Sequence, residues 1–140
     1  DNGIVFKDDN LTVEAFKVNH GEFEDAYGFR FTSKDKVIVF SGDTGPSKIL
    51  ERYAKDADIL VHEVYSYAGF LKKTKDWQIY HKGHHTSTYE VGEIAARAKP
   101  KLLVLSHILF WGADEQDILE ETRTTFSGNI KIAEDLMVIK

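Results

Sequence analysis

Residues that bind metal ions or transfer protons follow three apolar runs of this chain. Asp43 comes after the run VIVF, His62 and Glu63 after ILV, and His107 after LLVLS. Carboxylate oxygens and imidazole nitrogens are accepted zinc ligands, and both groups also act as general acids and bases. Ligands of open α/β sheets bind just past the carboxyl ends of the strands. These three strand ends therefore predict a single site.

Each of these residues also has a plainer interpretation. Asp43 is equally well placed to cap the helix that the following Gly45-Pro46 turn begins. A lone histidine at a strand end, such as His107, more often bonds a backbone group than a metal ion. The pair His62-Glu63 is also typical of a solvated strand end.

A group of histidines, His81, His84 and His85, stands just before a predicted helix. Clustered histidines bind metal ions, whereas the Lys-Gly between them is typical of a loop. An imidazole at this place can also act as an acid, a base or a charge stabiliser. Glu63 is a candidate to orient such an imidazole through a charge-assisted hydrogen bond.

The elements that position these residues follow an α/β pattern. Short apolar or alternating runs predict strands at 11–18, 27–32, 37–40, 58–64, 102–107, 130–133 and 136–139. Helical spacing predicts helices at 46–55, 87–98 and 114–126. The second helix starts with a capping box formed by Ser87 and Glu90. The aromatic, Lys-rich segment 65–83 is predicted to be irregular, and an excursion of that length is more often functional than idle.

The composition narrows the class of protein. A chain of 140 residues with 42% hydrophobic content is one domain or part of one. The absence of Cys excludes disulfides, thiolate metal sites and a Cys nucleophile, and leaves the compartment open. A net charge of −5 with scattered Lys and Arg argues against a stand-alone nucleic-acid binder and, mildly, against tRNA processing. No apolar stretch is long enough to span a membrane, so no membrane partner is expected.

Taken together, the motifs AYGFRF, VFSGDT, VHE, HTS and VLSH resemble the C-terminal half of a metallo-β-lactamase-fold hydrolase. They are most similar to the ribonuclease Z and arylsulfatase-like branch, and the resemblance covers nearly the whole chain in order. It implies that residues 1–140 form half of a four-layer αββα sandwich. This half would be a mixed β-sheet with helices on its outer face. The other face should be apolar because a second sheet packs there in the full fold.

The resemblance also implies roles for individual residues. Asp43 matches the aspartate that bridges two metal ions, usually zinc, with manganese or iron as alternatives. His107 matches a histidine that ligates one of these ions. His85 matches a catalytic histidine that donates a proton or stabilises charge over the scissile group, and Glu63 matches the glutamate that holds it. His20 matches a further histidine near the site, with a supporting role.

One family motif does not occur in this chain. The signature His-x-His-x-Asp-His, which supplies most of the metal ligands, is absent from these 140 residues. The chain therefore carries two of the usual ligands, and a two-ligand site should bind zinc weakly. We expect the missing N-terminal half to carry the signature and the 140-residue piece alone to be inactive. A naturally truncated, inactive relative is the alternative.

The resemblance predicts a metal-dependent hydrolase that cleaves an ester with a metal-activated water. The substrate would be a small-molecule or nucleotide ester, either a phosphodiester or a sulfate ester. The expected partners are the N-terminal half or a second copy of the chain, because an uncovered apolar face favours association. The rival prediction is a non-catalytic α/β module that binds an anion or a protein partner at the same strand ends.

Overall fold

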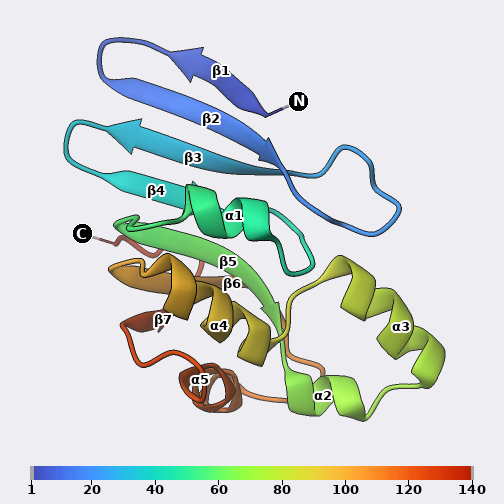
Figure 1. The fold of residues 1–140 in the computed structure, drawn as a ribbon. Helices are drawn as coiled ribbons and strands as arrows, with labels where there is room; N and C mark the ends of the chain where they lie inside the picture. Colours follow the sequence, from blue (N-terminus) through green and yellow to red (C-terminus); the bar gives the residue numbers. More distant parts are fainter. Residues whose placement is uncertain (1, 140) are drawn as a thin grey trace.

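A computed structural model describes residues 2–139 and shows one seven-stranded sheet in which neighbouring strands follow chain order (Figure 1). The strands are β1 (Gly3–Lys7), β2 (Leu11–Lys17), β3 (Tyr27–Ser33), β4 (Val37–Phe40), β5 (Ile59–Tyr65), β6 (Leu102–Leu109) and β7 (Ile130–Ile132). Pairing is antiparallel from β1 to β4 and parallel from β4 to β7. The predicted mixed α/β sheet is confirmed.

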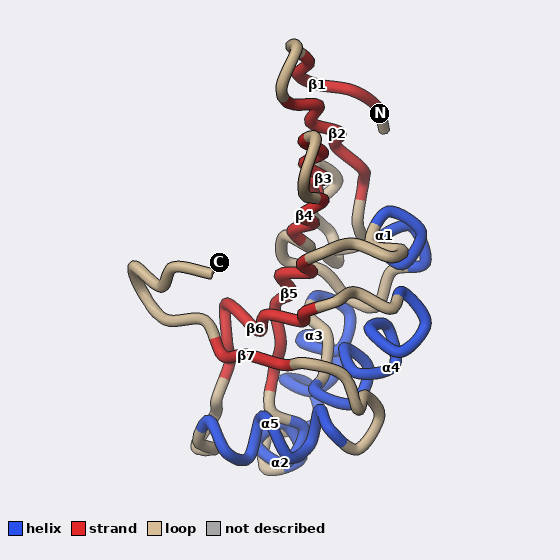
Figure 2. The backbone as a smooth tube through the Cα atoms, turned by 90° about the vertical axis from the view of Figure 1, so that its left-hand side faces the viewer, coloured by secondary structure: helices blue, strands red, loops and turns tan. Residues whose placement is uncertain are grey.

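The helices all lie in the connections between parallel strands, because such strands can be joined only by long crossovers. They are α1 (Lys48–Tyr53), α2 (Tyr67–Leu71), α3 (Lys75–His84), α4 (Thr88–Ala98) and α5 (Glu115–Arg123). Figure 2, which views the sheet along its edge, shows α1 and α4 on the same side of it. None of the helices within residues 2–139 is long and apolar enough to cross a membrane.

The core lies between the sheet and these helices. Alternation along the strands turns Phe16, Val39, Leu60 and Leu103 toward the helices, and each of the four is fully buried. The helices complete the core with Leu50, Val91, Ile94, Ala95 and Ile118. Burial of these side chains fixes the register of the parallel strands, and it thereby fixes where each strand ends.

The opposite side of the sheet, which we call the open face, carries the alternate residues Phe29, Phe31, Ile38, Phe40 and Val61. The strand register places them side by side, with Phe29 opposite Phe40 and Phe31 opposite Ile38. Phe29 is 37% exposed and Phe40 is 43% exposed. No helix covers this face in Figure 2. The expectation of an apolar second face agrees with this arrangement.

Two predictions about elements are wrong, and one strand was not predicted. Segment 65–83 is not irregular but largely helical, because α2 and α3 use Phe70, Trp77 and His84 as inward residues in place of Leu or Ile. Residues 136–139 do not form a strand; they follow a turn in which Met137 N–H donates to the Glu134 carbonyl. Strand β1 is an addition that the sequence patterns did not reveal.

Candidate active site

Asp43 lies in a tight turn after β4. Gly42 has φ +62°, and a Cβ there would lie 2.4 Å from the Tyr27 carbonyl oxygen, so the turn needs glycine. The turn is held from β5, where Val61 accepts from Ser41 N–H at 2.9 Å and Glu63 N–H donates to Ser41 Oγ at 3.1 Å. Asp43 itself is half exposed, and the cap of α1 is Ser47. The helix-cap interpretation of Asp43 is therefore wrong.

His107 lies at a bulge in β6. The pairing with β5 slips by one residue after Ser106, and His107 has φ +44°. Such a bulge re-aims a side chain, and a positive φ in a histidine is uncommon and mildly strained. The ring of His107 is 49% exposed, and its Nδ1 lies 3.8 Å from Asp43 Oδ1. The bulge thus brings the ends of β4 and β6 to one place.

Glu63 and His85 form a buried pair beside Asp43 and His107. Glu63 Oε1 accepts two hydrogen bonds, from Thr44 N–H at 3.0 Å and from His85 Nδ1 at 3.0 Å. Glu63 is 3% exposed, and His85 is 8% exposed. Because the carboxylate only accepts, the Nδ1 of His85 must carry the proton. In the neutral ring, Nε2 then keeps a free lone pair.

Opposing effects set the protonation of this histidine. Burial alone lowers the pKa of His85, but the hydrogen bond to Glu63 and the negative charges of Glu63 and Asp43 outweigh it. The pKa of His85 is therefore raised above its ordinary value. An imidazole of this kind keeps its charge to a higher pH than an exposed histidine does.

The donor atoms fit a metal ion. Glu63, His85 and His107 each offer a ligand atom, and these atoms lie within 4.8 Å of one another. Tetrahedral zinc with bonds near 2.0–2.1 Å separates its ligand atoms by about 3.3–3.4 Å. The 3.8 Å between Asp43 Oδ1 and His107 Nδ1 is close to that separation. A cavity of about 220 Å³ is lined by Asp43, Glu63 and His107 together with Tyr27, Phe29 and Phe40.

Comparison with known proteins places this site in a family. Residues 1–108 match the β-lactamase superfamily domain. The chain belongs to the metallo-β-lactamase superfamily. Ribonuclease Z of Archaeoglobus fulgidus is 37% identical over 108 residues, covering 76% of this chain and 33% of that protein. The chain thus spans about a third of the length of this relative. The matches to this and other ribonuclease Z proteins place the chain in the ribonuclease Z-like branch.

Solved structures share the fold. The metallo-β-lactamase-fold protein YhfI of Bacillus subtilis superposes with a TM-score of 0.74 at 22% identity, over 92% of this chain and 48% of that one. The short form of human tRNase Z gives a TM-score of 0.69 at 25% identity, over 99% of this chain and 45% of that one. The predicted fold class, an α/β half of a metallo-β-lactamase-type sandwich, agrees with these neighbours.

The structure brings together the four residues that the sequence singled out, Asp43, Glu63, His85 and His107. The interpretation of His62-Glu63 as a solvated strand end is wrong, because His62 is fully buried and Glu63 nearly so. His62 donates from Nδ1 to the Glu63 carbonyl at 2.6 Å, and its Nε2 has no partner among the described residues. His62 belongs to β5 and contributes to the wall of the cavity.

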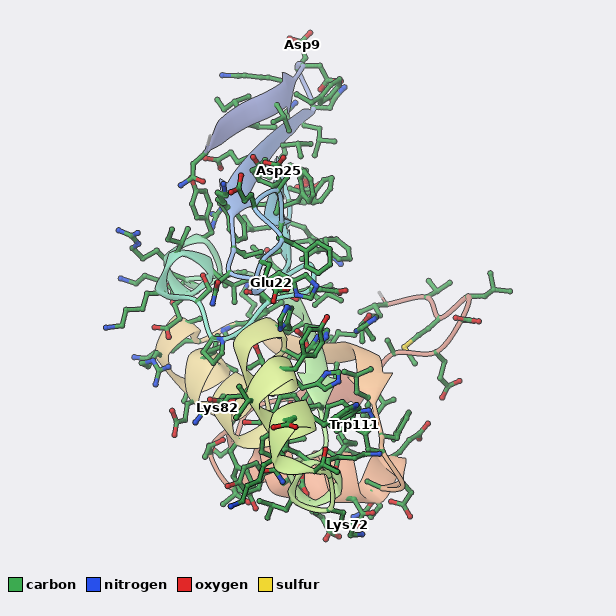
Figure 3. All side chains as sticks on the ribbon, turned by 90° about the vertical axis from the view of Figure 1, so that its right-hand side faces the viewer. Asp9, Glu22, Asp25, Lys72, Lys82 and Trp111 are labelled. Atoms are coloured by element: carbon green, nitrogen blue, oxygen red, sulfur yellow. The ribbon has the colours of Figure 1, made fainter. Side chains whose placement is uncertain are left out.

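Sequence reasoning missed an aromatic wall beside His85. The ring of His81 stacks on His85 with 5.6 Å between centroids, and Trp77 and Trp111 lie 3.7 Å and 4.9 Å from His81. Figure 3 labels Trp111, which comes from the loop after β6 and not from α3. The aromatic content of 65–83 was a signal for part of this wall. No local pattern linked it to Trp111.

Proposed function

We propose that this chain forms part of the active site of a metal-dependent hydrolase that cleaves a phosphodiester. The observation that carries the proposal is the meeting of Asp43 and His107 with the buried Glu63–His85 pair, at the ends of three adjacent strands. Membership of the metallo-β-lactamase superfamily supports a divalent metal and hydrolysis.

Asp43 and His107 are the residues we assign to metal binding. Both side chains are about half exposed at the rim of the 220 Å³ cavity, so they are free to take up an ion. Zinc suits a set of imidazole and carboxylate donors, and manganese or iron are the alternatives. When bound, such an ion supplies a water of lowered pKa and polarises the ester oxygen.

His85 is the residue we assign to proton transfer. Its Nδ1–H is held by Glu63, which leaves Nε2 free to carry or donate a proton. Glu63 is fixed in turn by Thr44 N–H, so the pair cannot rotate without breaking two hydrogen bonds. The cationic form of His85 stabilises negative charge on the ester, or it protonates the leaving group.

The remaining ligands are proposed to come from outside residues 1–140. Two ligands do not saturate a zinc ion, and the chain spans about a third of its ribonuclease Z relative. A second sheet that carries those ligands would cover the open face, because Phe29 and Phe40 lie both on that face and in the wall of the cavity. In the whole protein, Asp43 and His107 would hold the metal together with those further ligands.

The substrate is proposed to be a phosphodiester rather than a sulfate ester. The relatives that match this chain are named ribonuclease Z, and the phosphodiester is the bond that a ribonuclease cleaves. The net charge of −5 gives no broad basic surface for a long nucleic acid, which favours a short diester as the substrate. RNA is the larger candidate that the relatives suggest.

Hydrolysis of bis(p-nitrophenyl) phosphate by the full-length protein tests the proposal, with p-nitrophenyl sulfate as the comparison substrate. We expect metal-dependent cleavage of the diester and a loss of more than about 100-fold in kcat/KM for Asp43→Asn. Glu93→Gln, an exposed carboxylate on α4, is the matched control and should keep its activity. Equal activity in Asp43→Asn would contradict the proposal and favour a non-catalytic binding module.

A further inference from the structure

We propose that His20 is a positioning residue, which holds the catalytic histidine His85 in place by binding the last carbonyl group of α3. The inference rests on the proposed function, in which His85 transfers a proton. It concerns the clasp, which we define as residues 19–21 between β2 and β3. The clasp contacts the segment before His85 on one side and the Asp43 turn on the other.

The first contact is at the end of α3. The last carbonyl groups of a helix have no donors within it and must accept hydrogen bonds from outside. Here Gly21 N–H donates to the Gly83 carbonyl at 3.1 Å, and His20 Nδ1 lies 2.8 Å from the His84 carbonyl. Because a carbonyl only accepts, His20 Nδ1 carries the proton. The clasp thus caps α3 at the two residues immediately before His85.

These contacts matter for His85 because the chain leaves the helix there. His85 has extended backbone angles, φ −133° and ψ 167°, and its N–H still donates to the His81 carbonyl at 2.9 Å. The direction in which the chain leaves α3 sets where the imidazole meets Glu63. Two hydrogen bonds on the preceding carbonyls fix that direction. In Figure 3 the loop that carries Glu22 lies next to the helix that carries Lys82.

The second contact ties the clasp to the metal-binding turn. The Asn19 carbonyl accepts from Gly45 N–H at 2.7 Å, and Thr44 Oγ1, whose nearer acceptor is the Gly45 carbonyl, lies 3.1 Å from it. A direct bond completes the connection, since Thr86 Oγ1 donates to the Thr44 carbonyl at 2.6 Å. Three consecutive residues therefore hold the Asp43 turn and the His85 segment at a fixed distance from each other.

The close approach of the clasp to α3 requires glycine at position 21. Gly21 has φ +58°, and a Cβ there would lie 1.9 Å from His84 Nε2. The ring of His84 has no room to move away, because it is 4% exposed and stacks on Tyr80 with 4.0 Å between centroids. The Gly83 carbonyl accepts the hydrogen bond from Gly21 N–H, but a Cβ at Gly83 would meet no atom within 4 Å. Gly83→Ala is therefore a matched control for Gly21→Ala.

His20 acts through His84 and not directly on substrate or metal. Its Nδ1 is used by the His84 carbonyl, and its ring meets the ring of His85 edge-on, with 5.2 Å between centroids. Removing His20 should therefore change how His85 is held while leaving metal binding intact.

Two substitutions at position 20 separate the hydrogen bond from the bulk of the ring. In His20→Asn the side-chain amide keeps an N–H donor near the place of Nδ1, whereas His20→Leu removes it. In the full-length protein we expect His20→Leu to lower kcat for bis(p-nitrophenyl) phosphate by about 10- to 100-fold, with KM and metal content within about twofold of wild type. His20→Asn should recover most of the loss.

Amide hydrogen exchange gives a readout that does not depend on activity. Exchange at His85 N–H should be at least about tenfold faster in His20→Leu and Gly21→Ala, and unchanged in His20→Asn and Gly83→Ala. Unchanged exchange in His20→Leu would overturn the proposal, as would His20→Asn behaving like His20→Leu. Loss of metal from His20→Leu would make His20 a ligand and would also overturn it. The expected exchange pattern in a protein that hydrolyses nothing would support the clasp while rejecting the proposed function.

Discussion

At the scale of single residues, Glu63 connects the parts of the site. One carboxylate oxygen accepts from the backbone of the Asp43 turn and from the ring of His85. The same carboxylate is the main reason that the charged form of His85 survives its burial. A residue with both functions cannot be replaced by its uncharged isostere without changing the protonation of its partner.

Glu63→Gln should therefore lower the pKa of His85. The glutamine carbonyl can still accept from Thr44 N–H, but it removes the negative charge that raises the pKa. The sign follows for activity as well: if charged His85 is the proton donor, kcat falls as pH rises through its pKa, and in Glu63→Gln that fall moves to lower pH.

An NMR titration of the His85 ring protons in the metal-free chain measures this shift. Glu93→Gln, which changes an exposed carboxylate on α4, should leave the His85 titration unmoved. A His85 pKa that is the same in Glu63→Gln and wild type would show that Glu63 does not control the proton.

Burial of His62 predicts that the stability of the fold depends on pH. Burial lowers the pKa of this fully buried imidazole, so the folded chain keeps it neutral. Below about pH 6.5 this histidine binds a proton in the unfolded chain but not in the folded chain. The free energy of unfolding therefore falls by up to about 1.4 kcal/mol for each pH unit. The free energy of unfolding should thus decrease from pH 7.5 to pH 5.5, more in wild type than in His62→Leu. Urea unfolding at both pH values checks this, and equal decreases would contradict it.

At the scale of elements, the start of α4 supports the site. Ser87 Oγ accepts from Glu90 N–H at 3.3 Å, and Glu90 Oε2 accepts from Ser87 N–H at 3.0 Å, which forms the capping box that the sequence predicted. Ser87→Ala should cost about 1 kcal/mol in urea unfolding and should shift the His85 ring signals, since His85 is two residues away. Asp114→Ala removes the equivalent cap of α5 and is the matched control. It should cost a similar amount without moving the His85 signals.

The sequence was informative about elements wherever burial imposes a pattern. Three strands are continuous apolar runs, and Asp43, Glu63 and His107 lie at their ends. Their C-terminal ends could be located because such runs are easy to recognise. The helical character of segment 65–83 was missed because the inward residues of α2 and α3 are Phe70, Trp77 and His84, which form no regular aliphatic periodicity. The bulge at His107 left no local signal, because a positive φ in a histidine is imposed by the neighbouring strand.

At the scale of the whole molecule, the sheet has two unequal faces. Helices pack on one face of its parallel half, whereas Phe29 and Phe40 remain more than a third exposed on the open face. Contiguous exposed apolar side chains of this kind mark an interface. The proposed second sheet would cover them, and it would carry the missing metal ligands to the same cavity.

The 140-residue chain on its own should consequently self-associate. Replacing Phe29 and Phe40 together by Ser should shift sedimentation velocity profiles toward monomer, because it removes the apolar centre of the open face. Ile79→Ser is the control, since Ile79 is 73% exposed and belongs to α3, not to the sheet. A wild-type chain that sediments as a monomer at high concentration would argue that the open face needs no cover.

Metal content of the purified full-length protein tests the central claim most directly. Asp43 and His107 are assigned as ligands, so wild type should retain at least one zinc or manganese ion per chain, and Asp43→Asn and His107→Leu should each lose metal and hydrolysis together. Glu93→Gln should keep both. Less than one ion per wild-type chain, or full metal content and undiminished hydrolysis in Asp43→Asn, would contradict the account.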